Sequence, residues 1–193
     1  MNAIQKAHGF HPVFDAQAMF RLLLKAMANP ASPVEIRPFA AKFSGEYPEM
    51  LAIAMTLLDN EVGFSTCENQ TLSDDIASLT LSRREALEAA DYLFITDPSL
   101  LGRAMVQAKC GALANPHRSA TIVVRNQGAA LHPLRLAGPG IRGAAPWLVT
   151  DTVWQALEFR DGLFYEYPQG VDLLFVTEGG ELVAIPRLTR KEA

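Results

Sequence analysis

The spacing of apolar residues predicts an amphipathic helix near the start of the chain. Four apolar residues fall at positions i, i+3, i+4 and i+7, as one face of a helix requires: Phe20, Leu23, Leu24 and Met27. Asp15 precedes them as a candidate N-cap. Asn29-Pro30 ends the pattern, because proline disfavours helical geometry in the residue before it. We therefore expect a helix that begins at Asp15 and ends before Asn29.

Helical and strand patterns alternate along the rest of the chain. The predicted helices span residues 46–58, 72–81, 98–110 and 146–159. Short apolar or β-branched runs predict strands at residues 34–37, 62–64, 92–95, 119–124 and 134–137. This alternation indicates a mixed-sheet, layered α/β fold. We expect a single domain over residues 15–193, preceded by an irregular arm over residues 1–14.

The C-terminal strands, residues 172–177 and 182–187, form a predicted hairpin. Gly179 and Gly180 suit a two-residue turn, so Glu178 would pair with Glu181. In an even register Asp172 then lies directly opposite Arg187, and opposite charges at that spacing stabilise a sheet by ~0.2–1 kcal/mol. Pairing should end at Pro186, which has no N–H to donate. We predict a contact between Asp172 and Arg187.

Composition limits the class of protein. The chain has 193 residues, 49% hydrophobic and 20% charged, which is typical of a globular domain. A net charge of −4 argues against binding to nucleic acid or to an acidic membrane. The N-terminal arm lacks a signal-peptide core, and no apolar run approaches the ~20 residues that cross a bilayer. Cys67 and Cys110 have no CxxC spacing and are expected to be reduced thiols. We expect a soluble, cytoplasmic protein.

Two pairs of basic residues are candidates for anion binding. His117 and Arg118 come just before the predicted strand at residues 119–124, where they could hold an anion or, for histidine, transfer a proton. No carboxylate or serine is tied to them by a recognised spacing. Arg21 and Lys25 share one face of the first helix and could bind phosphate or an acidic partner. A structural or solvated position remains the alternative for each of these residues.

Motifs for independent catalysis are absent from the sequence. Gly138-Pro139-Gly140 lacks the third glycine and the adjoining helix of a dinucleotide fingerprint, so we expect a structural turn there. The histidines form no HExxH pair, and neither a P-loop nor a GxSxG motif is present. The lysines available for a pyridoxal-phosphate Schiff base lie in no recognisable cofactor loop: Lys6, Lys25, Lys42, Lys109 and Lys191. We expect no catalytic residue, metal or cofactor.

Five segments, in order along residues 12–190, carry a resemblance to a known family. They begin at Asp15-Ala16-Gln17, Leu57-Leu58-Asp59, Asn115-Pro116, Gly138-Pro139-Gly140 and Tyr167-Pro168-Gln169-Gly170, and the last runs through Asp172 to Pro186-Arg187. Together they resemble the PhnH family, the H subunits of the bacterial carbon–phosphorus lyase system, which handles phosphonates. Three residues depart from the family pattern: Ala31 stands where glycine is common, and Ala112 and Leu188 where threonine is.

The resemblance implies a fold and a set of partners. The implied fold is similar to the major domain of type I pyridoxal-phosphate aminotransferases, without that cofactor. The implied partners are the G, I and J subunits, with a homodimer when the subunit is isolated. The assembly, with further proteins, forms ribose 1-phosphonate 5-triphosphate from a nucleoside triphosphate and a phosphonate. The family assigns no catalytic residue to this subunit.

Two functions follow as hypotheses. In the first, which we favour, the chain is a non-catalytic, accessory subunit that acts through its surfaces in this transferase complex and has no independent activity. In the second, it binds nucleotide or phosphonate and contributes residues to a shared active site. The anion-binding residues would then be Arg21, His117 and Arg118. Arg187 fits this second hypothesis less well, because Asp172 is expected to neutralise it.

Overall fold

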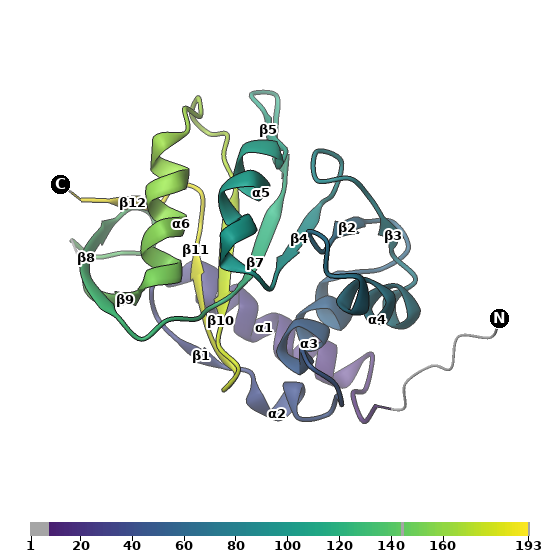
Figure 1. Cartoon of the computed structure of the whole chain (residues 1–193). Coiled ribbons are helices and arrows are strands. Elements are labelled where there is room, and N and C mark those ends of the chain that lie inside the picture. The colour runs from purple at the N-terminus through teal and green to yellow at the C-terminus, as the bar shows by residue number, and fades with distance from the viewer. Residues whose placement is uncertain (1–7, 144, 193) are drawn as a thin grey trace.

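A seven-stranded sheet forms the centre of the molecule. The computed structural model describes residues 8–143 and 145–192. In spatial order the strands are β1 (Val34–Glu35), β11 (Glu181–Ile185), β10 (Asp172–Val176), β7 (Thr121–Arg125), β4 (Tyr92–Ile95), β2 (Gly63–Ser65) and β3 (Arg83–Arg84) (Figure 1). Neighbours from β10 to β3 are parallel, whereas β11 runs antiparallel to both β10 and β1. The expected mixed sheet is therefore confirmed.

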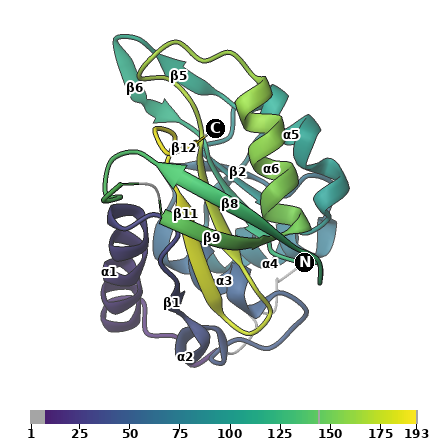
Figure 2. The same cartoon turned by 90° about the vertical axis from the view of Figure 1, so that its left-hand side faces the viewer.

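Helices cover both faces of this sheet. On one side lie α1 (Phe14–Ala28), α3 (Pro48–Leu57) and α4 (Gln70–Thr80), with α2 (Arg37–Ala40) packed beside α3. On the other side lie α5 (Leu101–Gln107), preceded by the short η1 (Pro98–Leu100), and α6 (Asp151–Gly162). Figure 2 shows α1 and the α5–α6 pair on opposite sides of the strands. Alternate residues of β10 enter the two cores: Leu174 joins the first and Phe175 the second.

Two smaller sheets accompany the central one, and the β8–β9 sheet adds Leu134, Leu136 and Val149 to the second core. The strands β12 (Arg190–Lys191), β8 (Leu131–Ala137) and β9 (Ala145–Thr150) form an antiparallel sheet, and β5 (Cys110–Ala112) pairs with β6 (Asn115–Ser119). The prediction of a helix over residues 146–159 was wrong in its first five residues. Those residues pair with β8, and α6 begins only after Thr150, whose hydroxyl caps the helix by accepting from the Val153 N–H.

The first helix is present, but its buried face differs from the prediction. The buried residues are Met19, Leu23 and Ala26, whereas Phe20 is 43% and Leu24 52% exposed. Asp15 lies in the first turn and does not cap the helix; its carboxylate accepts hydrogen bonds from the His11 backbone N–H at 2.7 Å and from the Lys42 ammonium at 2.6 Å. These two bonds, in that order, hold the pKa of Asp15 below its usual value.

Residues 8–13, before this helix, have no regular secondary structure, but part of this segment is packed. Phe10 is 3% exposed and joins the first core, and His8 stacks on Phe43 with ring centroids 5.1 Å apart. Residues 1–7 of the predicted arm lie outside the described residues. Within the described part of the chain, no helix is long and apolar enough to span a membrane.

The register of the C-terminal hairpin differs by one residue from the prediction. Thr177, and not Glu178, lies opposite Glu181, so the loop has three residues, Glu178 to Gly180. Its geometry is set by a contact with α2: the Gly180 carbonyl accepts from the Ile36 N–H at 2.7 Å, and Gly180 takes a left-handed φ of +84°.

Gly180→Ala tests that constraint. A Cβ at this position would meet the backbone nitrogen of Arg37 at 2.6 Å and its Cα at 2.7 Å. Left-handed backbone costs a residue with a Cβ ~1–2 kcal/mol, and the steric conflict adds to this. We expect Gly180→Ala to lower the free energy of unfolding by about 2 kcal/mol or more, measured by urea denaturation.

Gly162→Ala is the matched control. Gly162 ends α6, and a Cβ there would meet no atom within 4 Å. Because alanine favours a helix over glycine by up to ~1 kcal/mol, this variant should unfold at the same urea concentration as the wild type or at a higher one. Equal losses in both variants would contradict a constraint specific to the hairpin loop.

Candidate functional site

Charged side chains of the protein itself occupy the carboxyl end of β7, on the edge where open α/β sheets usually bind ligands. Arg125 ends β7, and its Nε lies 3.4 Å from the carboxylate of Glu49, in the first turn of α3. Arg125 also forms an ion pair with Glu178 and lies 5.1 Å from the ring centroid of Tyr47. Glu49 is 1% exposed, and burial raises the pKa of its carboxyl. These contacts engage the Arg125 guanidinium within the protein.

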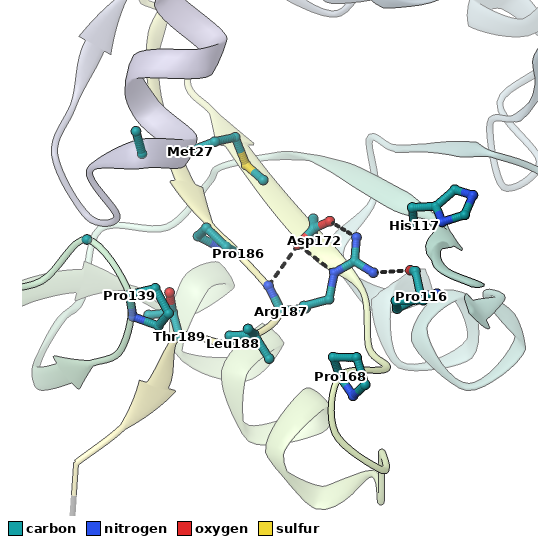
Figure 3. Close-up of a pocket in the computed structure, with 12 residues that line it drawn as sticks. Met27, Pro116, His117, Pro139, Pro168, Asp172, Pro186, Arg187, Leu188 and Thr189 are labelled. Carbon is teal, nitrogen blue, oxygen red and sulfur yellow. Dashed lines mark hydrogen bonds and ion pairs between the residues drawn. The ribbon is translucent and has the colours of Figure 1, made fainter. Parts of the chain in front are cut away.

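A pocket of about 480 Å³ opens at the opposite edge, beside the amino end of β10. We call it the proline-lined pocket, because Pro116, Pro139, Pro168 and Pro186 form much of its wall (Figure 3). The polar residues in the wall are His117, Asp172, Arg187 and Thr189. Its residues come from the end of α1, the β5–β6 hairpin and the segments next to β8, β10 and β11. Four of the five segments that carry the family resemblance therefore meet at this pocket.

The predicted contact between Asp172 and Arg187 is confirmed, although its geometry differs from a cross-strand pair. In the observed register Asp172 faces Pro186, and β11 ends at Ile185. The Asp172 carboxylate accepts from the Arg187 backbone N–H at 2.8 Å, from Nε at 3.3 Å and from Nη2 at 2.5 Å. The remaining guanidinium nitrogen donates to the Pro116 carbonyl. Arg187 thus joins β10, the end of β11 and the β5–β6 hairpin.

This arrangement decides which chemistry the pocket favours. Each nitrogen of the Arg187 guanidinium already donates to Asp172 or to Pro116, and Asp172 is only 7% exposed. A bound anion would have to compete with these partners. Thr189 is completely buried, and its hydroxyl makes no hydrogen bond to another described residue. The pocket therefore favours an apolar group that also brings a polar atom to Thr189.

The structure places one of the sequence-predicted site residues in a pocket wall and the other two on the surface. His117 lines the proline-lined pocket, at the opposite end from Pro139 (Figure 3). Arg118 follows it on β6 and is exposed, and Arg21 is exposed on α1. Thr189 and the four prolines were not anticipated as site residues; the recurrence of proline in the family segments was the available signal. A substrate-binding role for Arg21, His117 and Arg118 stays a prediction.

The glycine turn after β8 is structural, as expected. Gly140 has a φ of +84°, and a Cβ there would lie 2.4 Å from the carbonyl oxygen of Ala28, the last residue of α1. The absence of a side chain lets this turn close directly on the end of α1. Because Ala28 and Gly140 both line the proline-lined pocket, the close approach fixes one side of its mouth.

Neither cysteine forms a disulfide. Cys67 is buried, and desolvation raises the pKa of its thiol to about 11, whereas Cys110 is half-buried. Among residues 8–143 and 145–192, no three histidine, cysteine, aspartate or glutamate side chains come close enough to hold a metal ion.

Replacement of Glu49 tests the carboxyl edge. Its folded-state pKa lies above the unfolded value, so the folded state binds this proton more tightly. The Glu49 carboxyl therefore contributes to the stability of the fold at low pH. This contribution is lost as the pH rises through the pKa that the carboxyl has in the folded state. We therefore expect Glu49→Gln to be as stable as the wild type or more stable at neutral pH. The difference in the free energy of unfolding between this variant and the wild type should shrink as the pH falls toward the pKa of Glu49 in the unfolded state. Urea denaturation over a pH series measures it. Glu178→Gln, which alters an exposed partner of Arg125, should show no comparable trend.

A double-mutant cycle tests the Asp172–Arg187 pair. Arg187→Met would leave a buried carboxylate without its charged partner, which costs ~3–5 kcal/mol for fully buried pairs. We expect Asp172→Asn together with Arg187→Met to recover most of this loss, because asparagine still accepts the residue 187 N–H. The free energy of unfolding of the four proteins measures the coupling. Additive losses would contradict the pair as an interacting unit.

Comparison with known proteins identifies the family. The family model described as "Bacterial phosphonate metabolism protein (PhnH)" matches residues 8–192. No curated protein matches the chain. The match covers nearly every residue that the structure describes, including all the segments that wall the proline-lined pocket. The chain therefore belongs to the PhnH family of bacterial phosphonate metabolism proteins.

Proposed function

We propose that this protein is an accessory subunit of the carbon–phosphorus lyase core complex. In this role it supports the formation of ribose 1-phosphonate 5-triphosphate and acts through its surfaces. The single observation that carries the proposal is the family match over residues 8–192. The proposed partners are the G, I and J subunits, in the cytoplasm, and the isolated chain is proposed to form a homodimer. The proposed fold relationship is to the major domain of type I aminotransferases, without pyridoxal phosphate.

The geometry of the two sheet edges supports an accessory role. At the carboxyl edge, Arg125 is engaged by Glu49 and Glu178. At the amino edge, Arg187 is engaged by Asp172 and by the Pro116 carbonyl. Arg125 and Arg187 thus both have partners within the protein. A pocket with an apolar wall suits a protein surface better than a multiply charged substrate.

Co-expression with the G, I and J subunits tests the proposal. We expect this chain to enter the assembly in a fixed stoichiometry, measured as mass by light scattering after size exclusion. The matched control is the same co-expression without this chain, which gives the mass of the other subunits alone. Elution of this chain apart from an otherwise intact complex would refute the accessory role.

A second candidate function is direct binding of nucleotide or phosphonate. His117 in the pocket wall favours it, together with the exposed cations Arg21 and Arg118, which form no ion pair with another described residue. Titration of ATP and methylphosphonate into the isolated protein tests this function. A site filled at 100 times its Kd would stabilise the fold by ~2.7 kcal/mol. No heat and no shift in Tm would exclude it.

A further inference from the structure

The interior of the proline-lined pocket is shaped for an apolar group. Its wall includes Met27, Leu188 and the four prolines, and its volume of about 480 Å³ lies in the range of ligand pockets in proteins. Its charged pair is internally neutralised, since Asp172 and Arg187 face each other. An occupant therefore gains most from burying apolar surface against this wall.

One buried polar atom in the wall lacks a partner. Thr189 is 0% exposed, and its Oγ1 makes no hydrogen bond to any residue in the described part of the chain. A buried hydroxyl without a partner is unfavourable, because it has lost its hydrogen bonds to water and gained none in the protein. An occupant that brings a carbonyl, an amide or a hydroxyl to Thr189 would remove this penalty. The pocket thus contains a hydroxyl donor, that of Thr189, for which the protein supplies no acceptor.

Exposed apolar side chains lie on the same loop and hairpin that contribute to the pocket wall. Phe164 is 94%, Tyr167 72% and Leu113 53% exposed. They belong to one unit, because the loop before β10 is bonded to the β5–β6 hairpin: the Gln169 side chain donates to the Gly111 carbonyl at 2.9 Å. The same loop and hairpin contribute Pro168 and Pro116 to the pocket. An apolar surface that extends outside a cavity fits a macromolecule better than a small ligand.

The segments around the pocket carry unpaired positive charge. Arg21, Lys25 and Ala28 share one stripe of α1, and Ala28 lines the pocket. His117 and Gly140 also line the pocket. Arg118 comes one residue after His117, and Arg142 comes two residues after Gly140. None of these four cations forms an ion pair with another described residue. Glu166 is the acidic residue of the loop before β10.

We propose that the proline-lined pocket receives an apolar side chain from an acidic loop of a partner subunit. The inference rests on the proposed function, which supplies such a partner. The cations around the pocket attract and orient the acidic loop, and the pocket buries its apolar anchor, as at the centre of protein interfaces. A backbone or side-chain oxygen of the same loop accepts the Thr189 hydroxyl proton.

Filling the mouth of the pocket tests the proposal. In co-expression with the G, I and J subunits, Ala28→Trp should weaken incorporation by about tenfold or more, as loss of an anchor does. Ala89→Trp is the matched control, because Ala89 is an exposed alanine outside the pocket and outside the α1 stripe that carries Arg21 and Lys25. Circular dichroism and Tm of the isolated variants establish that both fold. Equal incorporation of both variants would overturn the inference and leave the proposed function intact.

Thr189→Val tests the unpaired hydroxyl by opposite effects on two readouts. The isolated variant should have the same Tm as the wild type or a higher one, because the removed hydroxyl has no internal partner. Its incorporation should nevertheless fall several-fold, because the loop loses a hydrogen bond. A fall in Tm with unchanged incorporation would contradict a partner at this hydroxyl.

Charge reversal tests the acidic nature of the loop. Arg118→Glu should weaken incorporation, and the wild-type affinity should fall as salt is raised. Arg83→Glu, at the far edge strand β3, is the control with the same change in net charge. Equal effects of both reversals would overturn a local charge match.

Other occupants give different results. If the wild type itself does not assemble with the three subunits, the proposed function fails and this inference fails with it. If Ala28→Trp instead turns a dimer of the isolated protein into a monomer, the occupant is a second copy. If methylphosphonate or ATP raises the Tm of the wild type but not of Ala28→Trp, the occupant is a small anion. Each of the last two results would overturn the proposal for an acidic loop.

Discussion

The amino edge of the sheet depends on the ion pair and hydrogen bonds between the Asp172 carboxylate and Arg187. Asp172 begins β10, a strand that parallel β7 flanks on one side and antiparallel β11 on the other. By holding both the backbone N–H and the guanidinium of Arg187, it turns the chain after β11 back toward the sheet. Arg187 then reaches the Pro116 carbonyl and ties in the β5–β6 hairpin. The walls of the proline-lined pocket are positioned by this contact.

The two edges of the sheet share one electrostatic property. Arg125 at the carboxyl edge and Arg187 at the amino edge are both partly buried, and each is held by carboxylates. A buried guanidinium without a counter-charge would be strongly unfavourable. Both edges are therefore neutral inside, and free positive charge remains on exposed residues outside the pocket. Such a distribution suits recognition of a charged surface around an apolar anchor.

The order of strands and helices could be predicted in large part from sequence, whereas boundaries and faces could not. Tyr92–Ile95 was predicted to the residue, because a β-branched and aromatic run allows few alternatives. Residues 146–150 were misassigned, since a short apolar segment fits either a strand or a helix until β8 pairs with it. On α1 the apolar pattern fits two adjacent faces, and packing against α3 and β11 selected the one with Met19 and Leu23.

The sequence alone determined the fold class, the family and the meeting of Asp172 with Arg187, because these depend on periodicity, motifs and local charge. The tertiary structure alone decided the hairpin register, because α2 selects the three-residue loop through Gly180. It also decided the pocket, whose walls come from segments as distant as Ala28 and Thr189. No local pattern marks Thr189 as buried without a partner. Burial depends on what packs around a side chain, and only the folded chain sets that.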